Sequence, residues 1–339
     1  MTDTVLVTGG AGFIGSHLVE HLAKTHNVVA LDDLSGGTRD NLIDDTRVQF
    51  HEMSVNDPLD QLFREYKFSQ VFHFAAYAAE GLSHHIRKFN YENNVVGSAN
   101  VINACVKHGV DRLVFASSIA VYGDGKPPFY ETMQCDPCDP YGVAKYAVEM
   151  DLAVAARHYG LEYTVFRPHN VYGERQNICD PFRNVVGIFL RNACRGDALP
   201  IFGDGTQSRA FTYVRDIIGP IVDAATDSRC INQTFDIGGQ QVYTVNELAA
   251  AVGKALDVSV EKRYLPERPE AKHAYATHKK IKHWFPSMCQ TSLSDGLAAM
   301  AEQVAISLEH GKTQLPALEV ADWLPDSWRR HYSDSVSLQ

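Results

Sequence analysis

A glycine-rich turn near the N-terminus constrains the fold of this 339-residue chain more than any other feature. The turn reads Thr8-Gly-Gly-Ala-Gly-Phe-Ile-Gly15 and follows the apolar run Val5-Leu-Val-Thr8. Glycines at this spacing allow a tight turn from a strand into a helix, and they leave room for a phosphate at the first helical N–H groups. The sequence therefore predicts a strand, a turn and a helix over residues 12–24, with an anion-binding helix N-terminus.

Short apolar runs alternate with helical patterns through the first half of the chain. The predicted strands cover residues 5–8, 28–31, 48–50, 71–74, 112–117 and 163–167. The predicted helices cover residues 12–24, 58–66, 85–108 and 140–159. Continuous apolar strands that alternate with helices are typical of an α/β protein with a Rossmann-type, doubly wound parallel sheet.

The pattern loosens after Tyr172, where glycine, proline, asparagine and arginine become frequent. One more strand is expected at 233–238, and helices are expected at 246–256 and 292–310. We therefore expect a dinucleotide-binding domain over residues 1–173 plus about 215–243. A smaller α/β substrate lobe should comprise about 174–214 and 244–330, and residues 333–339 should be frayed.

Composition excludes several classes of protein. The formal net charge is −10, which argues against a general nucleic-acid binder. No apolar run approaches the roughly 20 residues that span a bilayer, and no basic segment precedes Val5. The seven cysteines are mostly isolated, and Cys135 with Cys138 would supply only two of four zinc ligands. We expect a cytoplasmic protein with reduced thiols, no metal and no membrane partner.

Asp32 indicates which dinucleotide the glycine turn binds. It follows the second predicted strand, about 20 residues after the glycines, where a carboxylate accepts hydrogen bonds from the ribose hydroxyls of NAD. A 2′-phosphate would be repelled by Asp32 and Asp33. The expected cofactor is therefore NAD rather than NADP.

Three residues further along carry a candidate acid–base group. Ser118 follows the fifth predicted strand, and Tyr141 and Lys145 lie one helical turn apart after a capping Asp139 and Pro140. An ammonium about 5 Å from the phenol would lower its pKa by about two units. Tyr141 is then expected to take a proton from a substrate hydroxyl while Ser118 holds the oxygen.

With these motifs the chain resembles the extended short-chain dehydrogenase/reductases, and within them the UDP-glucose/UDP-galactose 4-epimerases. The resemblance runs from Thr8 to about Trp284. Besides the glycine turn it rests on Leu31-Asp-Asp-Leu, His73-Phe-Ala-Ala76, Asn93-Asn-Val-Val-Gly97, Ser117-Ser-Ile-Ala-Val-Tyr-Gly123, Tyr141-Gly-Val-Ala-Lys145, Arg167-Pro-His-Asn-Val-Tyr-Gly173 and Ile201-Phe-Gly-Asp-Gly205.

The resemblance implies site residues one by one. The implied NAD contacts are Gly9, Gly12, Phe13, Ile14, Gly15, Asp32, Ser54, Val55, Phe74, Ala75, Ala76, Asn94, Ser117, Tyr141, Lys145 and His169. The implied substrate contacts are Ser118, Tyr141, Asn170, Arg209, Arg268 and Tyr275. Among these, Asn170, Arg209 and Arg268 match diphosphate-binding positions, and Tyr275 matches one that limits sugar size.

The resemblance also implies a reaction and an assembly. The expected reaction inverts C4 of a UDP-sugar through a transient 4-keto intermediate, with the nucleotide gripped and the sugar free to turn. Ala78, Ala79 and Gly81 are expected to leave the sugar side with little to clamp it. The helices around 94–105 and 143–155 are expected to form a homodimer interface.

Three positions depart from the better-known epimerases, and several alternatives stay open. Ser54 and Ala271 replace acidic residues, and Ala78 replaces a lysine found in some members. A UDP-uronic acid 4-epimerase is the first alternative. A dehydratase or decarboxylase is disfavoured, because Ile119-Ala120 stands where proton-transferring acids are usual. A non-catalytic NAD-binding sensor and a net oxidoreductase complete the set.

Overall fold

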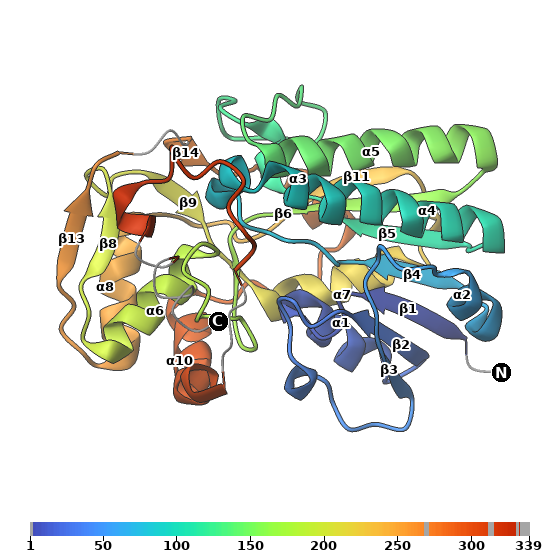
Figure 1. Cartoon of the computed structure of the whole chain (residues 1–339), viewed down its shortest axis with the longest axis horizontal. Helices are drawn as coiled ribbons and strands as arrows, with labels where there is room; N and C mark the ends of the chain where they lie inside the picture. The colour runs from blue at the N-terminus through green and yellow to red at the C-terminus, as the bar shows by residue number, and fades with distance from the viewer. Residues whose placement is uncertain (1–2, 268–270, 311–314, 330–331, 333–339) are drawn as a thin grey trace.

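A seven-stranded, entirely parallel sheet forms the centre of the computed structural model, which describes residues 3–267, 271–310, 315–329 and 332 (Figure 1). In spatial order the strands are β11 (Gln233–Ile237), β6 (Glu162–Pro168), β5 (Arg112–Ala116), β4 (Gln70–His73), β1 (Thr4–Thr8), β2 (Asn27–Asp32) and β3 (Val48–Glu52). The chain starts at β1 and winds outward in both directions, so the doubly wound parallel sheet is confirmed.

Helices cover both faces of this sheet, as its apolar strands require. On one face, β1, β2 and β6 pack against α1 (Phe13–Leu22) and α7 (Val214–Ala224). On the other face lie α2 (Asp60–Tyr66), α4 (Gly97–His108) and α5 (Pro140–Tyr159), which Figure 1 shows on the opposite side from α1 and α7. The carboxyl ends of the strands therefore open onto one edge, where ligands bind in such sheets.

The helix predicted over 140–159 forms with the predicted cap. The Asp139 carboxylate accepts a hydrogen bond from the Gly142 N–H at 2.9 Å, and Pro140 occupies the first turn. The helix ends at Gly160, whose φ of +74° is the left-handed conformation that terminates many helices. Local capping residues thus fix where Tyr141 and Lys145 stand relative to β5.

The single helix predicted over 85–108 is interrupted. It comprises α3 (Arg87–Tyr91), a π-helical turn η3 (Glu92–Val96) and α4. The side chain of Asn94 in this turn binds both backbone groups of Tyr77: its Oδ1 accepts from the Tyr77 N–H at 2.9 Å, and its Nδ2 donates to the Tyr77 carbonyl at 3.1 Å. The π turn aims Asn94 at the segment that leaves β4, a widened geometry that often marks functional sites.

A smaller α/β lobe follows the parallel sheet and packs around its own apolar core. Its helices are α6 (Val185–Arg195), α8 (Val245–Leu256) and α10 (Leu293–His310), so the two predicted helices are confirmed within one residue at each start. Its strands are β8 (Leu199–Phe202), β9 (Ser208–Ala210), β12 (Val242–Thr244), β13 (Lys262–Leu265) and β14 (His273–Ala274). The pair β7 (Val171–Tyr172) and β10 (Thr212–Tyr213) and the helix α9 (Lys279–Trp284) connect the lobe with the large sheet.

The segment 315–329 returns from this lobe to the large domain. Leu324 and Trp328 pack with Tyr77 and Leu82 in a separate apolar cluster. The Glu319 carboxylate accepts from the backbone N–H groups of Lys88 and Phe89 at 2.6 and 2.8 Å. Figure 1 shows this red segment passing beside α3. Within the part of the chain that is described, no helix combines the length and hydropathy needed to cross a membrane.

Candidate active site

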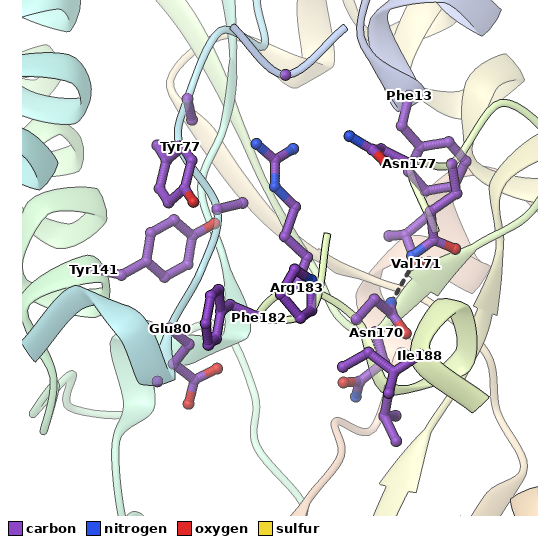
Figure 2. Close-up of a pocket in the computed structure, with 18 of the residues that line it drawn as sticks. Phe13, Tyr77, Glu80, Tyr141, Asn170, Val171, Asn177, Phe182, Arg183 and Ile188 are labelled. Atoms are coloured by element: carbon purple, nitrogen blue, oxygen red, sulfur yellow. Dashed lines mark hydrogen bonds between the residues drawn. The ribbon is translucent and has the colours of Figure 1, made fainter. Parts of the chain in front are cut away.

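A large cavity lies between the carboxyl edge of the parallel sheet and the smaller lobe. Its volume is about 1120 Å³, and both parts of the molecule contribute to its walls. Figure 2 shows Tyr77 and Tyr141 at one side, Phe13, Asn170 and Asn177 at the other, and Arg183 reaching between them. A cavity of this size can hold a dinucleotide together with part of a second ligand.

The glycine turn forms one wall of the cavity. Gly9 has φ of +70°, and a Cβ there would lie 2.7 Å from the Ala75 nitrogen. A Cβ at Gly15 would collide with the Gly9 carbonyl oxygen. Gly12 lines the cavity between Gly9 and Asp32, and no side chain caps α1. The residues present therefore fit a diphosphate, since its approach to the helix N-terminus depends on there being no side chain at Gly12.

Asp32 borders the same wall at the end of β2. Its Oδ2 accepts from the Ala11 N–H at 3.1 Å and its Oδ1 accepts from the Leu34 N–H at 2.8 Å. These bonds fix the carboxylate and leave further lone pairs for two vicinal hydroxyls. Burial raises the Asp32 pKa above its ordinary value, and the neighbouring charge of Asp33 adds a smaller effect in the same direction. The geometry suits a ribose and disfavours an additional anion.

Ser118, Tyr141 and Lys145 converge on the cavity from β5 and α5. Lys145 Nζ lies 5.8 Å from the centre of the Tyr141 ring and donates to the Ala116 carbonyl at 2.7 Å. The Ser118 hydroxyl accepts from the Ala120 N–H at 3.1 Å, and it is near enough to the Tyr141 phenol to favour a lower pKa there. The structure thus brings together the three residues that sequence reasoning selected.

Burial sets the protonation behaviour of this group. It raises the Tyr141 pKa well above its ordinary value, while Ser118 acts in the opposite direction. It lowers the Lys145 pKa to about 7, with Glu149 opposing the change. The Tyr141 pKa is therefore raised by burial, which outweighs the lowering that we expected from a nearby Lys145 ammonium. Loss of water disfavours both the phenolate and the ammonium, so neither charge forms readily without a compensating partner.

A buried polar network lies behind the catalytic candidates, and sequence reasoning missed it. Arg167 donates to both carboxylate oxygens of Glu149, at 2.9 Å from Nε and 2.5 Å from Nη2. Arg167 also donates to the Tyr122 hydroxyl at 2.7 Å, and Tyr122 donates to Asp236. The Ser117 hydroxyl donates to Glu149. The only sequence signal is Glu149 one turn after Lys145 on α5.

The opposite wall carries two of the predicted diphosphate contacts. Asn170 has φ of +44° and donates from Nδ2 to the Ala210 carbonyl at 3.0 Å. Arg209 lines the cavity, and its guanidinium donates to the carbonyls of Ser208, Ala271 and Lys272. These bonds hold the guanidinium at the cavity wall. Arg268, the third predicted contact, lies outside the described residues.

Two predicted cofactor contacts do not line the cavity, because local structure engages them elsewhere. Ser54 accepts from the Asn56 N–H at 3.2 Å within a turn, while its neighbours Met53 and Val55 line the cavity. Asn94 supports the cavity wall indirectly through Tyr77. Both residues stay predictions as NAD contacts, although neither is among the residues that line the cavity.

His169 and Tyr275 likewise lie outside the cavity lining. The His169 ring is buried and stacks on His278, with their Nε2 atoms 2.7 Å apart. Tyr275 pairs through its backbone with Phe129. Burial among core groups, rather than exposure to the site, therefore determines the environment of His169.

The other predicted and described contacts, from Gly9 through Arg209, line the cavity.

The structure adds cavity residues that the sequence did not identify. Arg191 and Arg195, one turn apart on α6, line the cavity together with Arg183 and Arg263. The spacing of the α6 pair is a recognisable signal, whereas Arg183 and Arg263 carry none. The additional lining residues also include Glu80, His84, Trp323 and Trp328.

Comparison with known proteins identifies relatives over most of the chain. Residues 5–238 match the model of the NAD dependent epimerase/dehydratase family. A UDP-glucose 4-epimerase of Mycolicibacterium smegmatis is 34% identical over 88% of this chain and 97% of its own length. The structure of Thermotoga maritima UDP-glucose 4-epimerase with UDP-glucose is 34% identical, covers 90% of this chain and 99% of its own, and has a TM-score of 0.84.

A neighbour with a different named substrate is nearly as similar in structure. UDP-glucuronic acid 4-epimerase from Bacillus cereus, in complex with UDP-glucuronic acid and NAD, has a TM-score of 0.82 at 29% identity. It covers 89% of this chain and 99% of its own. These findings agree on an NAD-dependent nucleotide-sugar enzyme.

Proposed function

We propose, since this chain belongs to the NAD-dependent epimerase/dehydratase family, that it is a UDP-hexose 4-epimerase that interconverts UDP-glucose and UDP-galactose. One observation carries the proposal. A single cavity is lined by the glycine turn with Asp32, by the Ser118–Tyr141–Lys145 group, and by Asn170 and Arg209 on the opposite wall. Relatives named as UDP-glucose 4-epimerases support the choice of sugar.

The residues of the chain have separable tasks in this reaction. Bound NAD supplies a reversible hydride acceptor beside the substrate carbon. Tyr141 takes the proton of the C4 hydroxyl and later returns it, and Ser118 holds the oxygen through the 4-keto stage. Lys145, anchored on the Ala116 carbonyl, stands at the end of β5 beside the phenol ring. Because burial opposes the phenolate, Tyr141 needs a nearby positive charge when it gives up its proton.

Inversion requires a firm hold on the nucleotide and a weak hold on the sugar. Guanidinium groups on the substrate wall, including Arg209, suit phosphate oxygens. Ala78 and Gly81 line the cavity together with Glu80 and His84, whereas Ala79 is buried in an apolar cluster. A sugar on this side would therefore meet polar groups as well as small side chains.

Elimination of water is disfavoured at this site. Ile119 and Ala120 follow Ser118, and neither can transfer a proton. Uronic acid epimerisation uses the same ketone chemistry, and similarity to the Bacillus cereus enzyme makes it the alternative to separate.

A panel of UDP-sugars, monitored through the anomeric protons by NMR, tests the proposal. UDP-glucose should be converted to UDP-galactose without net formation of NADH. Turnover of UDP-glucuronate with neither hexose converted would assign the enzyme to the uronic acids instead. Stoichiometric NADH would indicate a net oxidoreductase.

A homodimer is part of the same proposal. Val143, Met150 and Val154 are exposed along one side of α5, and Val96 is exposed at the start of α4. Four apolar side chains, three on α5 and one at the end of η3 where α4 begins, form a surface that a second copy can cover by two-fold symmetry.

A further inference from the structure

Arg183 comes from the smaller lobe side of the cavity, immediately before α6. Its Nε lies 2.9 Å from Oδ2 of Asp180, and the Asp180 side chain is only 2% exposed. Asp180 is itself fixed, because its Oδ1 accepts from the Phe182 N–H at 2.9 Å. The ion pair holds one edge of the guanidinium and directs its two terminal nitrogens into the cavity.

These terminal nitrogens reach the loop that follows β2. A Cβ built on Gly36 would lie 2.7 Å from Nη2 and 3.1 Å from Nη1 of Arg183. On its way the guanidinium crosses the Tyr77 ring, with Cζ 4.9 Å from the ring centre. Figure 2 shows the side chain extending past Tyr77 and Tyr141 toward the middle of the cavity. A larger residue at position 36 would have to displace this guanidinium.

Arg183 therefore lies between the loop that follows Asp32 and the wall that carries Tyr77 and Tyr141, all of which line the cavity. Arg183 acts electrostatically on Tyr141 as well, where its charge lowers the pKa. The glycine turn Gly9–Gly15 contains no cationic side chain, and Lys145 is bonded to the Ala116 carbonyl. The α1 N-terminus alone offers about half a positive charge to a group that carries two negative charges.

We propose that Arg183 binds the diphosphate of NAD from the side opposite α1 and so retains the cofactor across the lobe boundary. A guanidinium that is held at Nε by a carboxylate and whose terminal nitrogens lie in the cavity is suited to phosphate oxygens. The proposal depends on NAD binding and not on which UDP-sugar is epimerised, so either can fail without the other.

Calorimetric titration of the full chain with NAD, ADP-ribose, adenosine and UDP tests this directly. Arg183→Gln should weaken NAD and ADP-ribose about tenfold or more, the scale of a lost charge-assisted hydrogen bond. Adenosine, which has no diphosphate, should bind equally to both proteins. Arg183→Lys keeps the partner of Asp180 and should lose less, which keeps the test valid if the glutamine variant folds poorly. Arg195→Gln, on the same side of the cavity, is the matched control and should bind NAD normally.

A second variant tests whether Arg183 acts through its position beside Gly36. Gly36→Ala should displace the guanidinium and weaken NAD, and it should weaken NAD little further when combined with Arg183→Gln. Unchanged NAD affinity in Arg183→Gln would overturn the proposal. So would an equal loss for adenosine, or a loss confined to UDP, which would assign Arg183 to the substrate.

Discussion

Burial moves the pKa values of Tyr141 and Lys145 in opposite directions, because it disfavours the charged form of each. The phenol is thereby kept protonated, and the amine loses its proton near neutral pH. This arrangement makes Tyr141 a proton acceptor only when a positive charge stands beside it. Proton transfer by Tyr141 is thereby linked to cofactor binding through the pKa values of Tyr141 and Lys145.

Replacement of Tyr141 by phenylalanine removes the proton acceptor and keeps the ring. We expect kcat to fall by roughly 10²-fold or more, the usual effect of losing a general base. NAD retained by the purified variant, measured by mass spectrometry, should be unchanged. Turnover close to that of the unmodified enzyme would remove Tyr141 from the proposed mechanism.

Lys145 should make stability depend on pH in a defined direction. Its folded pKa of about 7 lies below the ordinary 10.5, so the unfolded chain binds more protons between these values. Stability from this residue is therefore fully present above the unfolded pKa and is lost as pH falls toward 7. Relative to Lys145→Met, the free energy of unfolding should rise by at most about 1.4 kcal/mol per pH unit between roughly pH 8 and 10. Urea unfolding gives the comparison, and parallel pH curves for the two proteins would contradict it.

At the scale of elements, α5 joins the reacting groups to a buried ion pair. The Arg167–Glu149 pair is almost fully buried, and Tyr122 and Ser117 complete its hydrogen bonds. The helix is therefore fixed against β6 directly behind Lys145. Its position depends on charge neutralisation in the core as well as on apolar packing.

Removal of one charge from this pair should be costly. Glu149→Gln leaves Arg167 buried beside a neutral amide, and we expect the protein to lose roughly 3–5 kcal/mol in the free energy of unfolding. Asp45→Asn, which breaks the exposed pair with Arg47, is the control and should change little. If the two variants proved equally stable in urea, the buried pair would not fix α5.

The sequence predicted the features that depend on contacts between neighbouring residues. It did not predict those that depend on how distant elements pack together in the fold. The glycine turn and the Asp139 cap depend on neighbours within a few residues, so α1, α5 and the residues they present were predictable. The break in the 85–108 helix depends on Asn94 reaching Tyr77, and that contact exists only once β4 and η3 lie side by side. Arg183 is similar, because its place over Gly36 depends on how the smaller lobe meets the sheet.

The whole molecule should be a two-fold dimer through α4 and α5. Val96 and Met150 are 56% and 52% exposed in the single chain, unusual values for apolar residues on adjoining elements. Light scattering at micromolar concentration should give twice the mass of the chain. Val154→Arg should yield monomers, whereas Val258→Arg, an exposed valine beyond α8, should not. A monomer of the unmodified protein would contradict the assembly.

Inversion at C4 with return of the same hydrogen is the central claim, and isotope retention tests it most directly. UDP-glucose that carries deuterium at C4 is incubated with the enzyme in ordinary water, and the UDP-galactose formed is examined by NMR and mass spectrometry. We predict that deuterium stays at C4 through epimerisation, because the hydrogen removed from that carbon never exchanges with solvent. Loss of the label to water would show that the carbon is deprotonated instead, and it would contradict the mechanism assigned to Tyr141, Ser118 and NAD.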